Sequence, residues 1–494
     1  MWSKDKQHLN MKKTMVFVAL WALTSGVKAQ FNFEPVTQLL NDSIGVIGQA
    51  GQNCGFMIVQ GDSIIYEKYL GSWDSQTYQP IASGSKILSM ALMMRLIDEG
   101  YLHPNDTVQN FIPSFGGKPF MTLHQLMSHT SGLPGQSQYI SDNSYTLQQA
   151  VDSIGLKTPM TAFAPGTAFQ YGGVSMHVAG RMAEIATGVS WDSLFRQKIA
   201  LPLGMIHTDY AGLGATGNFR IAGGVGTTMP DFSKLLIMLL QYGRINNIEV
   251  LDSQIVRVMQ SDQTGEVPLI GTPYFNDALR QNLRYGYGIW IEEATNGETT
   301  QYGSQGAFGF TPWIDRCRNI ACVFFVRKSL GLVQPTHTRL RNLVEQIIPL
   351  KLQKPVITAV AGQLQSSYSF GNQWYFNGSL MSEETGQFVT PSQNGKYSVK
   401  FISEEGCEVF SDDYNYMLLS EAELPLSGDT AVYPNPARTV IYFECENGFR
   451  IMSSTGELLI ESSQDVNRIN ISELPAGLYF LQTGNRTVRF VKSW

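Results

Sequence analysis

The chain has 494 residues, of which 43% are hydrophobic and 15% charged, and its net charge is −6. The hydrophobic fraction is too high for a disordered chain, and the length suits about three domains of ~150 residues. Nucleic-acid-binding proteins carry an excess of basic residues, so the negative net charge excludes that class. Few charges together with 47 glycines favour an exported protein rich in loops and strands.

The N-terminus has the pattern of a cleaved signal peptide. Four lysines between residues 4 and 13 precede the apolar run Met15–Leu23, and Val27-Lys28-Ala29 carries the small residues of a cleavage site. The run is too short to span a bilayer. We therefore expect residues 1–29 to be removed and the mature chain to be exported without a transmembrane helix. An N-terminal anchor is the alternative.

Strand and helix patterns alternate over residues 30–352. Phe56–Gln60 and Ser63–Tyr69 flank Gly61-Asp62, which is a hairpin signal, and Ile87–Ile97 is apolar nearly all round, as a buried helix is. Further helices are expected at 147–154, 177–187, 192–199, 229–242 and 337–347, and late strands at 286–291 and 320–327. This order predicts an α/β (α+β) domain in which the first and last strands pair.

The helical patterns end near residue 355. Residues 355–424 carry short alternating strands, and residues 429–494 form another unit of short strands after Tyr433-Pro434-Asn435-Pro436. Both read as small all-β sandwich domains.

Cysteine and histidine usage gives no metal site. The cysteines are too few for a disulfide framework, and no zinc spacing or H-E-x-x-H is present. A disulfide between Cys317 and Cys322 is one reading, and buried free thiols are the favoured one. The five cysteines are Cys54, Cys317, Cys322, Cys407 and Cys445.

Ser83 and Lys86 form an S-x-x-K pair at the start of the apolar helix. A serine there lies near the positive end of the helix dipole, and a lysine one turn on shares its face and can accept the hydroxyl proton. The pair alone is weak, since S-x-x-K also occurs twice in residues 1–29 and a helix-capping serine explains it equally well.

Four further motifs follow in order: L-H-Q-L-M-S-H-T-S-G-L-P at 123–134, A-P-G-T-A-F-Q-Y at 164–171, P-L-G-M at 202–205 and A-G-G-V at 222–225. With the Ser83 motif, residues 40–345 resemble the serine β-lactamase/penicillin-binding protein superfamily. The likeness is to its branch of class C β-lactamases, D-alanyl-D-alanine peptidases and esterases. The resemblance implies a β-lactamase/transpeptidase-like fold, with an antiparallel sheet and a helical region.

The resemblance also implies residue roles. Ser83 is the acylated nucleophile, Lys86 its proton acceptor, and Tyr171 the family's Y-x-N tyrosine, which shares in proton transfer. Tyr274, in Tyr274-Phe275-Asn276, fits Y-x-N literally but lacks the surrounding pattern, so Tyr171 is preferred.

Two positions depart from the family. Gly173 replaces the asparagine amide of Y-x-N, and Ser304-Gln305-Gly306-Ala307 replaces the K-T-G or H-x-G strand. No cation is therefore expected to recognise a substrate carboxylate. The N–H groups of Ala307 and Ser83 are still expected to form the oxyanion hole.

Three residues near these motifs are given structural roles. His129, in the 123–134 motif, is expected to support a loop rather than catalyse. Trp313 and Asp315 are expected to cap a strand turn beside the site.

The C-terminal segment, residues 429–494, predicts where the protein is delivered. Residues 429–494 resemble the C-terminal sorting domain of the type IX secretion system, so its machinery is the expected partner and the cell surface or medium the destination. An adhesive β-domain is the alternative. Residues 355–424 look like immunoglobulin-like modules, with Trp374 in the core and Tyr397 as a corner tyrosine.

Together these observations predict an exported serine hydrolase that acts through an acyl-enzyme on esters or amides, D-amino-acid peptides included, without metal or cofactor. The alternatives are a D-alanyl-D-alanine carboxypeptidase, a β-lactamase, or a catalytically silent surface binding protein with the same fold.

Overall fold

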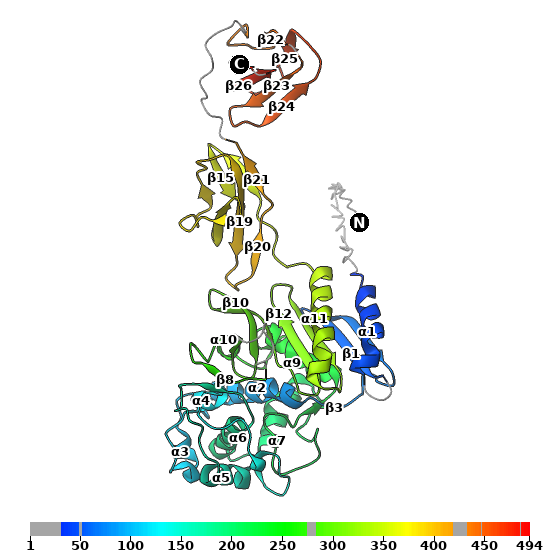
Figure 1. The fold of residues 1–494 in the computed structure, drawn as a ribbon, viewed down its shortest axis with the longest axis vertical. Coiled ribbons are helices and arrows are strands. Elements are labelled where there is room, and N and C mark those ends of the chain that lie inside the picture. The colour runs from blue at the N-terminus through cyan, green and yellow to red at the C-terminus, as the bar shows by residue number, and fades with distance from the viewer. Residues whose placement is uncertain (1–30, 49–51, 274–282, 418–431, 446, 485) are drawn as a thin grey trace, which may run out of the picture.

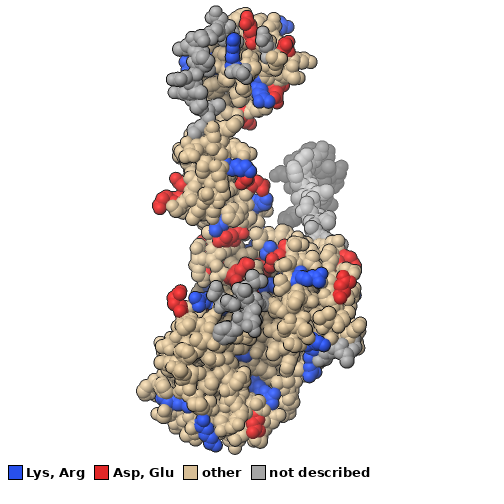
Figure 2. All heavy atoms as spheres, in the orientation of Figure 1, with Lys and Arg blue, Asp and Glu red and all other residues tan. Residues whose placement is uncertain are grey.

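The computed structural model describes residues 31–48, 52–273, 283–417, 432–445, 447–484 and 486–494. Three bodies follow one another along its long axis (Figure 1). The large body contains the elements from α1 to α11, the middle body contains β14 to β21, and the terminal body contains β22 to β27. Figure 2 shows acidic and basic side chains scattered over one face of all three. The expected signal peptide lies outside the described residues. Within them, no helix is both long and apolar enough to cross a membrane.

A seven-stranded antiparallel sheet, ordered β2-β1-β13-β12-β11-β10-β9, forms the centre of the large body. Its strands are β1 (Cys54–Gln60), β2 (Ser63–Leu70), β9 (Arg284–Tyr285), β10 (Trp290–Thr295), β11 (Glu298–Gly303), β12 (Thr311–Asp315) and β13 (Ile320–Phe325). Gly55 pairs with Phe325 and Gln60 with Ile320. The prediction that the first and last strands pair is confirmed.

Both faces of the sheet are covered. Phe56 and Ile58 of β1 point towards α1 (Glu34–Ile47) and α11 (Leu330–Ile347), whereas Met57 and Val59 point to the larger core on the opposite face. That core contains α2 (Ser85–Asp98), α6 (Val174–Thr187) and α9 (Met229–Leu240). The other helices are α3 (Val108–Phe111), α4 (Leu123–Met127), α5 (Leu147–Lys157), α7 (Trp191–Phe195), α8 (Leu201–Leu203) and α10 (Ser253–Gln260).

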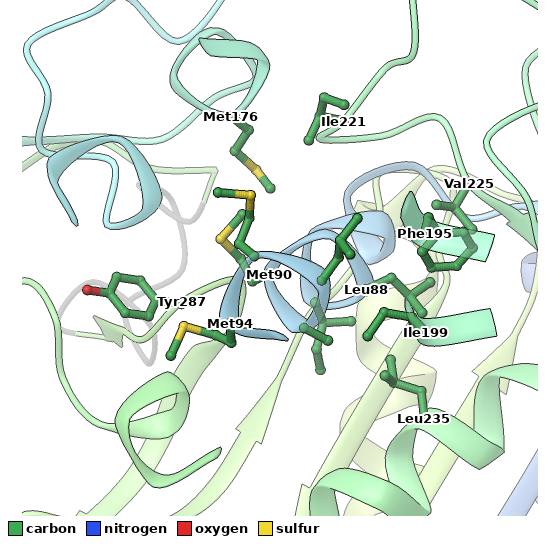
Figure 3. Close-up of a cluster of buried hydrophobic side chains, with 14 of the residues drawn as sticks. Leu88, Met90, Met94, Met176, Phe195, Ile199, Ile221, Val225, Leu235 and Tyr287 are labelled. Carbon is green, nitrogen blue, oxygen red and sulfur yellow. The ribbon is translucent and has the colours of Figure 1, made fainter. Parts of the chain in front are cut away.

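Helix α2 is buried on all sides, as its sequence predicts. Figure 3 shows its methionines Met90 and Met94 on one side and Leu88 on another, each facing apolar side chains from other elements. Ser85 through Met94 are all buried. The residues that open this helix are therefore held in a rigid, well-packed element.

Two expectations for the large body are wrong. The strand expected at 286–291 is interrupted, because Gly288 turns the chain at φ 78° between β9 and β10. Trp313 does not lie beside Ser83: it packs on Phe56 in the core under α1 and α11. Asp315 does cap a turn, by accepting a hydrogen bond from the backbone N–H of Arg318 at 3.0 Å.

The middle body consists of two small antiparallel sheets. One contains β14 (Ile357–Val360), β15 (Gln363–Ser366) and β18 (Phe388–Val389); the other contains β16 (Asn372–Phe376), β17 (Ser379–Leu380), β19 (Gly395–Ile402), β20 (Glu408–Phe410) and β21 (Tyr414–Tyr416). Trp374 and Tyr397 are buried in their shared core. The Tyr397 hydroxyl donates to the Gln393 carbonyl at 3.2 Å, which is the bond of a corner tyrosine.

The terminal body is also all strand. It contains a four-stranded sheet, β24-β23-β26-β27, beside the pair β22-β25. The strands are β22 (Val440–Tyr442), β23 (Phe449–Ser453), β24 (Leu458–Ser462), β25 (Arg468–Asn470), β26 (Gly477–Thr483) and β27 (Arg486–Lys492).

A disulfide between Cys317 and Cys407 joins the large and middle bodies. The alternative pairing of Cys317 with Cys322 is wrong. The favoured expectation of buried free thiols is confirmed for Cys54 and Cys322 and wrong for Cys317, which lies in the β12–β13 turn. An ion pair between Lys351 and Glu405 lies at the same junction. The partner of Cys317 is 90 residues away, so only the approach of the two bodies reveals it.

Candidate active site

Ser83 lies in a short 3-10 turn, Ala82–Gly84, which leads directly into α2. Ala82 adopts φ 46°, a left-handed conformation that alanine rarely takes. The Ser85 hydroxyl holds this turn by donating to the Ala82 carbonyl at 2.7 Å and accepting from the Val225 N–H at 3.0 Å. Ser83 is half-buried, so its hydroxyl is both fixed and reachable.

Lys86 lies one turn along α2, and its side chain reaches back to Ser83. Its Nζ donates to Ser83 Oγ at 3.0 Å and to the Ala222 carbonyl at 3.0 Å, and the residue is only 3% exposed. The A-G-G-V segment at 222–225 therefore contacts both the nucleophile turn and the lysine.

Tyr171 joins this pair from a separate segment. It follows β4 (Phe169–Gln170), and its N–H donates to the Gly271 carbonyl at 2.7 Å. Lys86 Nζ lies 4.5 Å from the centre of the Tyr171 ring, which is a cation–π contact. The structure thus brings Ser83, Lys86 and Tyr171 together. Tyr274, the alternative tyrosine, lies outside the described residues.

The segment 304–307 continues from β11 past the nucleophile turn. A Cβ on Gly306 would lie 2.1 Å from the Ile81 carbonyl and 3.4 Å from the Gly84 nitrogen, so only glycine permits this approach. Ala307, the next residue, is exposed. Because Gly306 lies against Ile81, the N–H of Ala307 belongs to a segment that packs directly against the turn carrying Ser83.

The two other residues of this segment are turned into the protein. Ser304 Oγ donates to the Gly288 carbonyl at 2.9 Å, and Gln305 Nε2 donates to Glu292 Oε1 at 2.9 Å. Glu292 also pairs with Arg341 of α11. Ser304 and Gln305 are both uncharged and 3% exposed, so neither offers a cation to a ligand beside Ser83.

His129 lies behind Tyr171. Its ring centre is 5.0 Å from that of Tyr171 and 5.7 Å from that of Phe169. Complete burial and the neighbouring Lys86 charge lower the pKa of His129 well below its usual range, so its ring is neutral. In the described part of the chain, neither ring nitrogen has a hydrogen-bond partner.

Sequence reasoning missed Ile140, which lies next to the Gly173 position. A Cβ on Gly173 would be 2.8 Å from Ile140 Cδ1 and 3.6 Å from Ala222 Cβ. Nothing in the local sequence marks Ile140, because it belongs to a short turn (Gln138–Ile140) 33 residues earlier in the chain.

The described residues contain no group of three or more histidine, cysteine, aspartate or glutamate side chains placed to hold a metal ion.

Comparison with known proteins identifies the family of two parts of the chain. Residues 46–345 match the Beta-lactamase family, and residues 431–494 match the Secretion system C-terminal sorting domain. A crystal structure of a beta-lactamase-like protein from Bacteroides dorei DSM 17855 is 30% identical, with a TM-score of 0.56, and covers 63% of this chain and 99% of its own.

Two curated relatives carry names of different activities. The D-alanyl-D-alanine-carboxypeptidase/endopeptidase AmpH of Escherichia coli (strain K12) is 25% identical over 40% of this chain and 58% of its own length. The esterase EstB of Burkholderia gladioli is 27% identical over 30% of this chain and 44% of its own. The chain spans about half the length of the curated relatives it matches.

The fold and the Ser83 site define a β-lactamase/transpeptidase-like protein, and the chain belongs to the Beta-lactamase family of serine hydrolases. It ends in a type IX secretion sorting domain, which marks it for the cell surface or the medium.

Proposed function

We propose that the protein is an exported serine hydrolase that forms an acyl-enzyme on Ser83 and cleaves esters or amides. The observation that carries the proposal is the buried Lys86 Nζ, 3.0 Å from Ser83 Oγ and over the ring of Tyr171. Two groups able to move protons, Lys86 and Tyr171, thereby gather beside one reachable hydroxyl.

The proposed reaction has two steps. Ser83 Oγ attacks the substrate carbonyl, its proton passes to Lys86 or Tyr171, and the tetrahedral oxyanion accepts hydrogen bonds from the N–H groups of Ser83 and Ala307. The leaving alcohol or amine takes the proton as the carbonyl–heteroatom bond breaks. Water then attacks the acyl-enzyme, gives its proton to the same relay, and releases the acid and free Ser83.

Esterase or amidase activity is preferred to carboxypeptidase or β-lactamase activity. The carboxylate-binding cation expected of those enzymes is replaced by Ser304 and Gln305, whose polar atoms are bonded to Gly288 and Glu292. An esterase and a carboxypeptidase both occur among the relatives. A silent binding protein is disfavoured, because a buried lysine aimed at a serine has no evident binding role.

The proposal also divides the chain. Residues 1–29 are the signal peptide, 30–352 the hydrolase, 355–424 an immunoglobulin-like sandwich and 429–494 the sorting domain handled by the type IX machinery. The corner-tyrosine bond of Tyr397 supports the third assignment, and the sorting-domain match at 431–494 supports the fourth.

Intact-mass spectrometry after treatment with a fluorophosphonate tests the proposal. We expect one adduct on the native chain, none on Ser83→Ala, and loss of p-nitrophenyl butyrate hydrolysis in Ser83→Ala with a nearly unchanged melting temperature. A nucleophile contributes to the reaction path and little to packing. A Ser83→Ala variant that keeps most of the activity would refute the assignment.

A further inference from the structure

Ile140, Gly173 and Ala222 form an apolar wall beside the candidate catalytic residues. Their closest approach is at Gly173, where the lack of a side chain leaves room for Ile140 Cδ1. Gly173 is two residues after Tyr171, so the wall starts in the same segment of the chain as the candidate catalytic tyrosine. The exposed surface of this wall comes mainly from Ile140, which is half-buried, whereas Gly173 and Ala222 are buried.

The apolar wall is tied to the nucleophile by short contacts. The Ala222 carbonyl accepts the bond from Lys86 Nζ at 3.0 Å, and the next residue, Gly223, comes within 3.7 Å of the Ala82 backbone when a Cβ is placed on it. Ala82 directly precedes Ser83. The apolar wall therefore shares segment 222–223 with the contacts that hold Lys86 and flank Ser83.

Two polar side chains near the wall, Arg220 and Asn218, are hydrogen-bonded within segment 139–143. Arg220 donates to the Ser141 carbonyl at 2.9 Å and to Asn143 Oδ1 at 3.1 Å. Asn218 donates to the carbonyls of Tyr139 and Asp142, at 2.7 Å and 3.0 Å. These four bonds hold segment 139–143 in place, and with it Ile140, while their donors are used within that segment.

We propose that Ile140 selects the acyl group: the enzyme takes unsubstituted alkyl acyl chains and discriminates against acyl chains that carry an amide. This inference rests on the proposed acyl-enzyme at Ser83. An alkyl chain gains contact with Ile140, whereas an amide N–H facing the same methyl groups loses water without finding an acceptor. Hydrophobic sites that differ by about one such group discriminate about 10-fold or more.

The test compares p-nitrophenyl pentanoate with p-nitrophenyl N-acetylglycinate, whose acyl groups both have five atoms along the chain and differ by the amide. Each kcat/KM is divided by the rate of hydroxide-catalysed hydrolysis of the same ester, with Ser83→Ala as the background. We expect the native enzyme to prefer pentanoate about 10-fold or more. Circular dichroism and thermal melts check that each variant folds.

Two variants of nearly identical shape isolate polarity. Ile140→Val removes Cδ1 and keeps an apolar surface, and Ile140→Thr has the shape of valine with one hydroxyl. We expect Ile140→Val to keep most of the preference and Ile140→Thr to lower it about 10-fold below that of Ile140→Val, because the hydroxyl pairs with the amide. Ile206→Val, at a position 76% exposed, is the matched control and should match the native enzyme.

A second measurement uses size instead of polarity. Gly173→Ala adds a Cβ 2.8 Å from Ile140 Cδ1, so the end of the isoleucine side chain must shift and the shape of the wall changes. We expect kcat/KM for pentanoate to fall about 10-fold relative to acetate, and Ile140→Val in the same chain to restore most of it.

The outcomes separate two failures. If no Ser83-dependent hydrolysis of any ester occurs, the proposed function is wrong and the inference falls with it. If hydrolysis depends on Ser83 but Ile140→Val and Ile140→Thr show equal preference, or Gly173→Ala leaves chain-length preference unchanged, only the inference is wrong.

Discussion

Gly306→Ala offers the sharpest test of how the site is assembled. The added Cβ would lie 2.1 Å from the Ile81 carbonyl oxygen, whereas real Cβ atoms essentially never come within 3.0 Å of another heavy atom. Because both groups belong to backbone, neither can rotate away. The segment 304–307 and the nucleophile turn must therefore separate by about 1 Å, and a misplacement of that size costs about 100-fold in rate.

The same substitution should have a smaller effect on stability. Overpacking a core position by one methyl group costs about 1–3 kcal/mol, which leaves the variant folded if the rest of the large body is intact. We expect kcat/KM for p-nitrophenyl butyrate to fall about 100-fold, and the urea midpoint to fall modestly with an unchanged slope.

Gly45→Ala is the matched control. Gly45 is in the last turn of α1, and a Cβ there would have no heavy atom within 4 Å. We expect normal activity and a gain in stability of at most about 0.5 kcal/mol, because 0.5–1 kcal/mol is the value for the middle of a helix. If Gly306→Ala were as active as Gly45→Ala, the close approach of segment 304–307 to Ser83 would not be needed for the reaction.

Three other predictions follow from the same structure. Lys86→Ala and Tyr171→Phe should each lose most of the esterase rate. The double variant should be barely slower than the slower single variant, because residues of one proton relay do not act additively. Fully additive losses would show that one of the two residues acts elsewhere. Cys407→Ser should keep the rate of ester hydrolysis within about twofold of the native rate. Protease cleavage between residues 348 and 356 should separate the large and middle bodies only in this variant or after reduction of the native chain. Separation of the unreduced native chain would contradict the disulfide. Deleting residues 430–494 should leave the hydrolase active but in the periplasm of the native host, since the sorting domain has its own core; full-level appearance of the truncated protein in the medium would favour an adhesive role.

Local sequence was sufficient to predict a contact where the residues that form it are close together in the chain. Ser83 and Lys86 are three residues apart, across the turn that opens α2, so their contact follows from the local helical geometry. The apolar composition of residues 87–97 predicted the burial of α2 correctly. The pairing of the first and last strands was likewise predictable, because β1 and β13 are the apolar strands at the two ends of one α/β unit.

Other predictions failed where distant segments decide the outcome. Cys322 is five residues from Cys317, yet Cys317 bonds to Cys407, because the β12–β13 turn meets a turn of the middle body. Trp313 was expected beside the site, but it lies in the core on the opposite face of the sheet. A strand has two faces, and the alternation of its side chains shows only which residues share a face, not which face the site occupies.

The sequence by itself determined the class of protein, the serine–lysine pair, the tyrosine motif and the sorting tail, since each is recognised from short motifs and from their order along the chain. Only the tertiary structure decided that Lys86 Nζ lies over the Tyr171 ring, that Gly306 touches the nucleophile turn, and that Ile140 fills the space at Gly173. The physical reason is that these contacts join segments between 33 and 225 residues apart. Close packing of the whole core, rather than any local pattern, sets their distances.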